Sequence, residues 1–327
     1  MTDIMVVSLE HELESDYLTE FQQHKRVKQN LFYTTGGAQS FYTYRGADIE
    51  QIKWQDEYAF FARQDFWQPD QTLAFISLGC GSAGPEQPLL HHAHAQGYQM
   101  AYFGVDSSHA MLELAQETLS QEHFARHFIQ ADFSTDACRQ ALRALVEHFD
   151  TRIIAMLGGT FGNFEQSVIV SILQHTVQPG DYFYLDIVPR YDSETQDRQL
   201  RRRLAQLPQN LSAFFANLLE KLCIPADAGE VYAEEAKETV VDAWHYAFFF
   251  KATRPLTFAC SGSQMTLVPG ETIELFNVRA YNPAALKTFL GEYGFVFVDE
   301  YIPDVGELSH LWQRFLFRKA GGKILLS

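Results

Sequence analysis

Three closely spaced glycines form a motif that is typical of a ligand-binding turn. Gly79, Gly81 and Gly84 fit the pattern GxGxxG, after an apolar run that begins at Leu73 and before a helical stretch. Glycine there permits a tight turn and a close approach of the backbone to a ligand, and the helix start offers unpaired N–H groups. Asp106 ends the next predicted strand, where a carboxylate can accept hydrogen bonds from both ribose hydroxyls. The combination predicts a nucleoside cofactor; a tight strand-to-helix turn without a ligand is the alternative.

The glycines alone do not decide between NAD and S-adenosylmethionine, but three features favour S-adenosylmethionine. The glycine strand starts about 70 residues into the chain, whereas many dehydrogenases open with it. Asp132 and Phe133 end the third predicted strand, where an acid could meet the adenine amino group and a ring could lie beside the base. The C-terminal order of helix, strand and strand resembles the antiparallel hairpin that ends class I methyltransferases. Methyl transfer is therefore favoured over hydride transfer.

The elements that must position these residues alternate along the chain. From Leu73 to Val188, short apolar runs alternate with amphipathic stretches, which predicts parallel βαβ units wound into one sheet. The rhythm then breaks, with a helical pattern over residues 190–222 and antiparallel strands over residues 231–280. The expected fold is α/β, a class I methyltransferase Rossmann-like sheet with an antiparallel C-terminal hairpin and an inserted α+β lobe. The expected domains are a cofactor-binding domain of residues 66–189 and 281–327 and a substrate-binding lobe of residues 1–65 and 190–280.

Composition excludes several other classes of function. The chain has 327 residues and a formal net charge of −16, which disfavours nucleic-acid binding because that depends on Lys and Arg contacts to phosphate. No apolar run approaches the roughly 18 residues of a membrane span, and the acidic N-terminus is unlike a signal peptide. Four cysteines without CxxC spacing, and His91, His92 and His94 without a nearby acid, predict no metal site. We expect a cytoplasmic protein, monomeric by default, with a small-molecule substrate and no membrane partner.

The segment MLGGTFGNF (156–164), followed by PGD (179–181), carries a sharper resemblance. It resembles the LGSTIGNF…PGD signature of the histidine-specific methyltransferases, which make the trimethylated betaine of histidine in ergothioneine synthesis. LGCGSAGPEQPLL, VDSSHAML and QADF resemble further segments of that family, as does FYTYRGADIEQI with the Glu57-Tyr58 that follows it. The resemblance runs, with gaps, from about residue 40 to the C-terminus.

The resemblance implies roles for individual residues. Asn163 would hold the carboxylate of an amino-acid substrate with the help of Tyr191, Tyr58 would face the substrate side chain, and Gly159 would lie beside the amine. Cys80, between two glycines, is interpreted as a small residue close to the backbone and not as a nucleophile. The expected cofactor site consists of Tyr42, Gly79, Cys80, Gly81, Asp106, Ser107, Asp132 and Phe133.

The chain departs from the family in the pocket for the side chain. Members of the family bind the imidazole of their histidine substrate through a Glu-x-Ser pair on an inserted strand. In this chain, Leu275 and Asn277 occupy those positions. Glu274 is displaced by one residue, and a displacement of one on a strand directs the side chain to the opposite face. We therefore expect Asn277 in a substrate pocket that differs from the family's. The family's lysine in the glycine loop is also missing, because Ala83, Gly84 and Pro85 occupy that stretch.

Methyl transfer from a sulfonium to an amine is an in-line displacement that needs little acid–base chemistry. We therefore expect no dedicated catalytic residue, and aromatic rings of Tyr42, Tyr58 and Phe161 are candidates for a wall that tolerates the sulfonium. The sequence predicts an S-adenosylmethionine-dependent N-methyltransferase acting on a small amino acid or related amine. A non-catalytic S-adenosylmethionine-binding protein and an NAD-dependent oxidoreductase are the alternatives.

Overall fold

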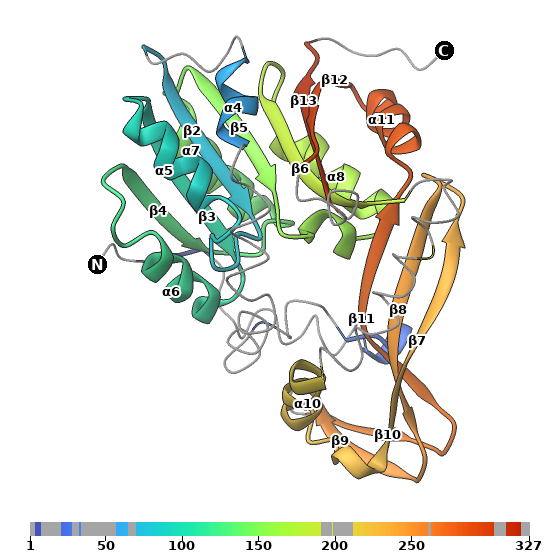
Figure 1. The fold of residues 1–327 in the computed structure, drawn as a ribbon. Helices are drawn as coiled ribbons and strands as arrows, with labels where there is room; N and C mark the ends of the chain where they lie inside the picture. Colours follow the sequence, from blue (N-terminus) through green and yellow to red (C-terminus); the bar gives the residue numbers. More distant parts are fainter. Residues whose placement is uncertain are drawn as a thin grey trace.

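A single mixed sheet connects both halves of the molecule in the computed structural model (Figure 1). The structure describes residues 4–7, 21–27, 33, 57–64, 70–190, 198, 212–260, 263–303 and 312–321. Among these residues, eleven strands form the sheet, in the order β1-β4-β3-β2-β5-β6-β11-β8-β7, with β13 beside β6 and β12 beside β13. The first six strands are β1 (Ile4–Val6), β2 (Thr72–Leu78), β3 (Gln99–Asp106), β4 (Ala125–Gln130), β5 (Thr151–Met156) and β6 (Tyr182–Pro189).

Helices cover both faces of these parallel strands. The strands β2 and β3 are buried along almost their whole length, as their nearly continuous apolar sequences require. One face packs against α4 (Glu57–Ala62), α5 (Gln87–Ala95) and α6 (His109–Thr118). The other face packs against α7 (Asp136–Val146), α8 (Gln166–Thr176) and α11 (Pro283–Glu292). The result is the three-layer α/β arrangement that the alternation in the sequence predicts.

The strand order reverses beside β2, and this reversal places the site. The chain runs from β2 outward through β3 to β4 and then returns to add β5 and β6 on the other side of β2. In open α/β sheets, ligands bind at the carboxyl ends of the strands where the order reverses. The segments that leave β2, β3, β4 and β5 therefore meet at one edge of the sheet.

The chain ends in the antiparallel hairpin that the sequence predicts. Strands β12 (Phe295–Tyr301) and β13 (Gln313–Lys319) pair with each other, and β13 pairs antiparallel with β6. Together with the parallel strands, this hairpin confirms the predicted class I methyltransferase fold.

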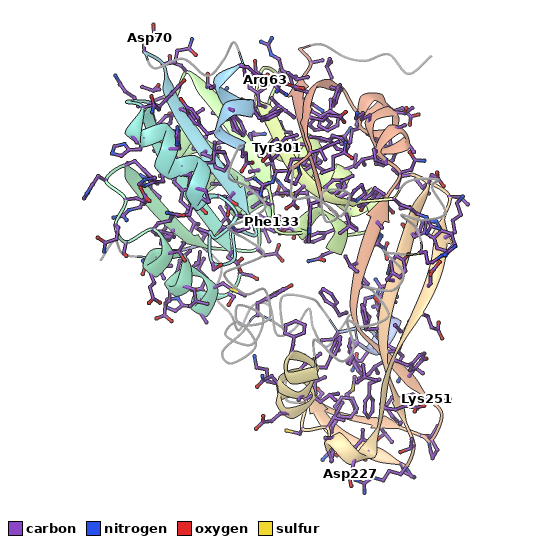
Figure 2. All side chains as sticks on the ribbon, viewed as in Figure 1. Arg63, Asp70, Phe133, Asp227, Lys251 and Tyr301 are labelled. Atoms are coloured by element: carbon purple, nitrogen blue, oxygen red, sulfur yellow. The ribbon has the colours of Figure 1, made fainter. Side chains whose placement is uncertain are left out.

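A lobe extends from the sheet beyond β6. It contains β7 (Gly229–Glu238), β8 (Ala243–Ala252), β9 (Leu256–Cys260), β10 (Ser263–Leu267), β11 (Thr272–Tyr281) and α10 (Ser212–Lys221), with a short 3₁₀ turn η3 (Ala226–Ala228). Strand β11 pairs with β6 only through Ala280 and Tyr281, and then diverges to pair antiparallel with β8. A second apolar core, rich in phenylalanine, fills the lobe between α10 and its strands. Asp227 and Lys251 lie at its end far from the parallel strands (Figure 2).

The described parts of residues 1–65 lie in two places. Strand β1 pairs in parallel with β4, and α4 packs against the central sheet. Phe21 and Val27 belong instead to the core of the lobe. The N-terminal region therefore contacts both parts of the molecule, whereas the sequence suggests a place with the lobe alone.

Among the described helices, none is long and apolar enough to cross a membrane. The part of the chain that the structure describes also contains no group of His, Cys, Asp and Glu side chains that could hold a metal ion. His91 lies on the exposed side of α5 and contacts the carboxylate of Glu122.

Candidate functional site

The glycine turn after β2 forms one wall of a cavity of about 480 Å³. Gly79 and Gly81 have φ angles of 69° and 53°, in the left-handed region that favours glycine. The N–H groups of Gly79 and Cys80 donate to the carbonyl of Val105 at 2.8 and 3.0 Å, which fixes the turn against β3. A Cβ atom at Gly79 would lie 2.7 Å from Cγ2 of Thr160. Glycine at 79 thus allows two loops to touch.

Asp106 joins the glycine turn to the end of β3. Its Oδ2 accepts a hydrogen bond from the N–H of Gly81, and its Oδ1 accepts one from the N–H of Ser108, both at 2.9 Å. Burial raises the pKa of this carboxyl, an effect that these backbone N–H groups oppose. A carboxylate has about four acceptor positions, so it can still accept hydrogen bonds from a diol at the cavity surface.

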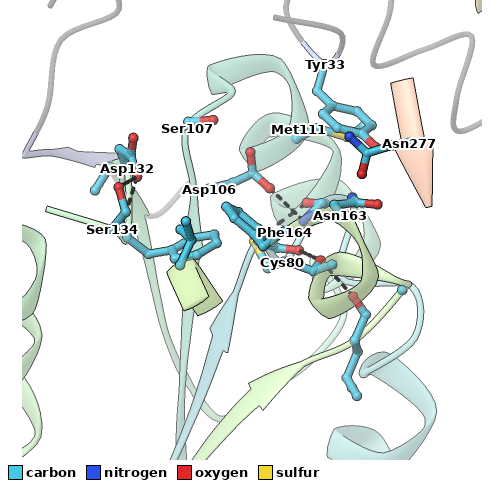
Figure 3. Close-up of a pocket in the computed structure, with 18 of the residues that line it drawn as sticks. Tyr33, Cys80, Asp106, Ser107, Met111, Asp132, Ser134, Asn163, Phe164 and Asn277 are labelled. Carbon is cyan, nitrogen blue, oxygen red and sulfur yellow. Dashed lines mark hydrogen bonds between the residues drawn. The ribbon is translucent and has the colours of Figure 1, made fainter. Parts of the chain in front are cut away.

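Asp132 and Phe133 line the same cavity after β4. Oδ1 of Asp132 accepts hydrogen bonds from the backbone N–H and the hydroxyl of Ser134, at 2.8 and 2.5 Å, which orients the carboxylate. The ring of Phe133 lies 5.4 Å from that of Phe164, measured between centroids. Figure 3 shows Asp132 and Ser134 on one side of the cavity and Asn163 and Asn277 on the other, with Asp106 between them.

The loop after β5 brings Asn163 to the glycine turn. Gly158 and Gly159 have φ angles of 73° and 88°, and their N–H groups donate to the two carboxylate oxygens of buried Asp186, each at 2.9 Å. The hydroxyl of Thr160 donates to the carbonyl of Gly79 at 3.2 Å. The 3₁₀ turn η2 (Thr160–Asn163) is therefore held against the glycine turn that follows β2.

The side chain of Asn163 lines the cavity. Its amide makes no hydrogen bond to any described residue, unlike the neighbouring polar groups of the site. A partly buried carboxamide with open donors can bind a ligand carboxylate or carbonyl.

Most of the predicted site residues surround one cavity, and several do not. The ring of Tyr58 contacts that of His92 on α5 at a tilt of 43°, with ring centroids 3.7 Å apart, and Tyr58 is not among the cavity-lining residues. Phe161 is fully buried against Tyr281 and lies in the core. Gly159 shapes the loop without lining the cavity, and Tyr42 and Tyr191 fall outside the described residues. The predicted residues that line the cavity are Gly79, Cys80, Gly81, Asp106, Ser107, Asp132, Phe133, Asn163 and Asn277.

The expectation that Glu274 faces away from Asn277 is wrong, because β11 contains a β-bulge. Glu274 pairs with Phe249 and Phe276 with Phe248, which leaves Leu275 as an extra residue. The extra residue shifts the alternation by one, so Glu274 and Asn277 share a face, and Nδ2 of Asn277 donates to Oε1 of Glu274 at 2.7 Å. Leu275 packs into the core of the lobe.

Sequence reasoning missed the contribution of the N-terminal region to the cavity. His24, Arg26, Val27 and Tyr33 all line it. The backbone of residues 25–27 bonds to Glu274, with the N–H of Val27 donating to its carbonyl at 2.8 Å. A short segment that docks on a bulged strand through its backbone has no sequence signal beyond Val27 and Tyr33 as isolated apolar residues.

A buried polar cluster supports the glycine turn from beneath. Arg314 on β13 contacts the carboxylate of Glu57 on α4, and the hydroxyl of Tyr184 donates to the same carboxylate. Nη2 of Arg314 also donates to the carbonyl of Pro85 at 3.4 Å. Burial raises the pKa of Glu86, which accepts a hydrogen bond from the hydroxyl of Ser77, to about 7. The cluster thus links four elements to the loop that follows Gly84.

The residues of the cavity fit an adenosyl cofactor. Its volume of about 480 Å³ lies within the range of small-molecule sites. The cavity is lined by the glycine turn after β2, by the carboxylate at the end of β3, and by an acid and a ring after β4. This arrangement is the one that a ribose and an adenine require. Fold and site together define an S-adenosylmethionine-dependent class I methyltransferase.

Comparison with protein families identifies the group more closely. The family model of histidine-specific, S-adenosylmethionine-dependent methyltransferases matches residues 13–314, and the chain belongs to that family. This membership settles the cofactor as S-adenosylmethionine in preference to NAD. No curated protein matches the sequence.

Several solved structures are similar to this chain at low identity. A methyltransferase from Methanosarcina mazei has 12% identity and a TM-score of 0.41, over 78% of this chain and 95% of that one. The glycopeptide N-methyltransferase MtfA, complexed with S-adenosylmethionine, has 12% identity and a TM-score of 0.41, over 82% and 94%. A methyltransferase from Leishmania major has 12% identity and a TM-score of 0.45, over 88% and 80%.

Proposed function

We propose that this methyltransferase acts on the amine nitrogen of a small amino acid or a close relative. The observation that carries the proposal is the environment of Asn163. Its side-chain amide lines the cavity without a hydrogen bond to a described residue, and its loop contacts the glycine turn through Thr160. A substrate whose carboxylate binds the amide of Asn163 lies in the same cavity as the cofactor residues, as a direct transfer requires.

The residues of the chain act by binding and orientation. When bound, S-adenosylmethionine would supply an electrophilic methyl group to a neutral amine. A C–N bond would form while the C–S bond breaks with its electron pair going to sulfur, and the resulting ammonium would release its proton to solvent. Asp106 binds the ribose hydroxyls, Asp132 and Phe133 bind the base, and Asn163 fixes the acceptor. Aligning two reactants in this way accounts for a large part of the rate in such displacements.

Cys80 lines the cavity and could compete as a methyl acceptor if it were ionised. Burial, and to a smaller extent the nearby Asp106 carboxylate, raise the pKa of this thiol well above its usual value. The thiol therefore stays protonated at neutral pH and is a poor nucleophile.

A labelled-transfer experiment tests the proposal. The protein is incubated with S-adenosylmethionine carrying a deuterated methyl group and with a panel of amino acids and simple amines, and the products are analysed by mass spectrometry. The expected product is an amino acid with the label on its α-nitrogen. Cofactor binding without label transfer to any member of the panel would contradict the proposal and would favour a non-catalytic cofactor-binding protein.

A further inference from the structure

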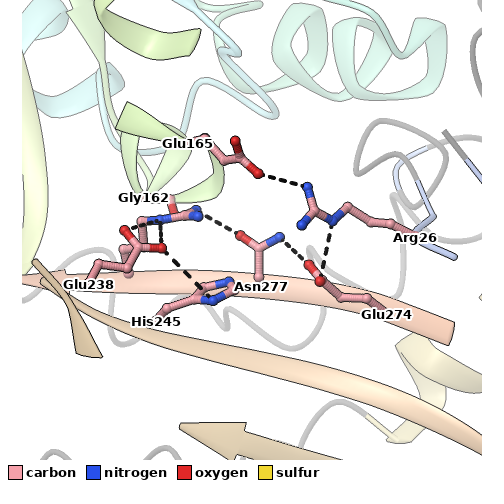
Figure 4. Close-up of polar contacts among 8 residues, drawn as sticks. Arg26, Gly162, Glu165, Glu238, His245, Glu274 and Asn277 are labelled. Atoms are coloured by element: carbon pink, nitrogen blue, oxygen red, sulfur yellow. Dashed lines mark hydrogen bonds and ion pairs between the residues drawn. The ribbon is translucent and has the colours of Figure 1, made fainter. Parts of the chain in front are cut away.

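A continuous chain of polar contacts runs along β11 beside the cavity (Figure 4), and Arg26, Glu165, Asn277 and Arg279 of this chain line the cavity. Three of its members lie on β11, one lies on β7, one directly precedes α8, and one comes from the N-terminal region. In order of contact they are Glu238, Arg279, Asn277, Glu274, Arg26 and Glu165.

The carboxylate of Glu274 is already engaged by other groups in this chain. Its Oε1 accepts from the amide of Asn277 at 2.7 Å, and its Oε2 lies 3.3 Å from Nε of Arg26. Glu274 is not among the cavity-lining residues, whereas Arg26 and Asn277 are. A cationic side chain in the cavity would therefore have to displace a guanidinium to reach this carboxylate.

Arg279 adds a second guanidinium at the same wall. Its Nε donates to both oxygens of Glu238 at 3.0 and 3.1 Å, and its Nη1 donates to Oδ1 of Asn277 at 3.0 Å. Its side chain is only 3% exposed yet lines the cavity, and Nη2 has no hydrogen-bond partner among the described residues. An N–H donor at a cavity wall without a protein partner favours a ligand that brings an acceptor.

The remaining titratable groups of this wall do not offer a free carboxylate. Glu238 accepts from Nε of Arg279, and Nδ1 of His245 lies 3.9 Å from the same Oε1 of Glu238. Burial and the charge of Arg279 lower the pKa of His245, which favours its neutral imidazole. Glu165 lines the cavity but is bonded to Nη1 of Arg26 at 3.0 Å and is half exposed.

We propose that Arg26 and Arg279 select a substrate whose side chain ends in a hydrogen-bond-accepting oxygen, a carboxylate or carboxamide, and reject a cationic side chain. This inference rests on the proposed function, since it concerns the side chain of the same substrate. The carboxylates of this wall, Glu165, Glu238 and Glu274, are each already paired with a guanidinium, so a cation would have to compete with Arg26 and Arg279 for them. An acceptor oxygen instead gains the open donor of Arg279.

The test compares methyl acceptors of similar size. Initial rates are measured with L-glutamate, L-glutamine, L-lysine and L-histidine, and binding of S-adenosylhomocysteine is measured separately by calorimetry. We expect glutamate or glutamine to have the highest kcat/KM, and their ratio separates a carboxylate from a carboxamide preference. Arg26→Met, which keeps the length of the side chain, should shift the lysine-to-glutamine ratio of kcat/KM toward lysine by about 10- to 100-fold.

Two controls keep the result interpretable. Arg26→Lys retains the charge and should leave the order of substrates unchanged. Arg254→Met removes a guanidinium that pairs with exposed Asp227 at the far end of the lobe, and it should change neither ratio nor rate (Figure 2). Failure to bind S-adenosylhomocysteine would overturn the proposed function itself. If the protein binds the cofactor, three results would overturn the selectivity alone. They are lysine or histidine as the best acceptor, no acceptor among the four amino acids, and an unchanged lysine-to-glutamine ratio of kcat/KM in Arg26→Met.

Discussion

The contact between Gly79 and Thr160 makes a quantitative prediction about how the two loops of the site depend on each other. In Gly79→Ala, the new methyl group would lie 2.7 Å from Cγ2 and 3.1 Å from Oγ1 of Thr160, at a residue with a φ angle of 69°. The left-handed backbone disfavours alanine by about 1–2 kcal/mol, and the overlap adds about 1–3 kcal/mol. The free energy of unfolding should therefore fall by roughly 2–5 kcal/mol.

Thr160→Ser separates these two contributions. It removes Cγ2 but keeps the hydroxyl, whose single hydrogen lies within reach of the carbonyls of Gly79 and Leu157. In the double variant, the overlap contribution of about 1–3 kcal/mol should be recovered while the backbone strain remains. Gly97→Ala is the matched control for strain alone, because Gly97 has a φ angle of 87° and no atom within 4 Å of its Cβ position.

Urea unfolding of the four variants and calorimetric titration with S-adenosylhomocysteine measure these effects. Gly79→Ala should also bind S-adenosylhomocysteine at least about tenfold more weakly, because the same overlap separates the two loops that line the cavity. A loss of about 1.4 kcal/mol in binding free energy corresponds to a factor of ten. Thr160→Ser should restore most of that affinity in the double variant. If Gly79→Ala were no more damaging than Gly97→Ala, or if Thr160→Ser recovered nothing, the two loops would not be in the contact described here.

Three further predictions follow from the site and its support. Asn163→Ala should raise the KM for the amino acid by about 10- to 100-fold, from the loss of one charge-assisted hydrogen bond, and leave the Kd of S-adenosylhomocysteine unchanged; an equal loss of cofactor affinity would contradict the role of Asn163. Burial raises the pKa of Glu86 from 4.5 to about 7, so the unfolded state releases its proton first. Wild type should therefore lose stability relative to Glu86→Gln as the pH rises from about 4.5 to 7, by at most about 1.4 kcal/mol per pH unit, with no further change above pH 7; a flat difference between their melting temperatures would refute this. Arg314→Met should lower the free energy of unfolding by about 3–5 kcal/mol, since it leaves the fully buried Glu57 without its cation, and Glu57→Gln in the same chain should recover part of that loss in urea unfolding.

The meeting of the predicted cofactor residues at one cavity could be predicted from the sequence because its determinants are local. Asp106 ends a strand and Gly79 and Asp132 closely follow one, each strand has a visible apolar run, and the carboxyl ends of parallel strands meet at one edge. The family-like segment around Gly158 and Asn163 added the loop after β5. These residues could be placed at one edge of the sheet without knowing which distant segments of the chain contact each other.

The substrate side depends on contacts between distant segments, which the sequence does not reveal. The bulge at Leu275 reverses the face of Glu274, and an ordinary run of alternating residues gives no sign of it. Arg26 reaches the cavity because its segment docks on β11 through backbone hydrogen bonds, for which any residue type would serve. The direction of Tyr58 likewise follows from how α4 packs against α5, and the ring contacts His92 instead of the cavity.

A crystal structure with S-adenosylhomocysteine bound would show where the cofactor lies. We expect the ribose hydroxyls against Asp106, the adenine between Asp132 and Phe133, and the sulfur facing the loop that carries Asn163. Density for the ligand at another place, or a sulfur directed away from Asn163, would show that the proposed cofactor site is wrong.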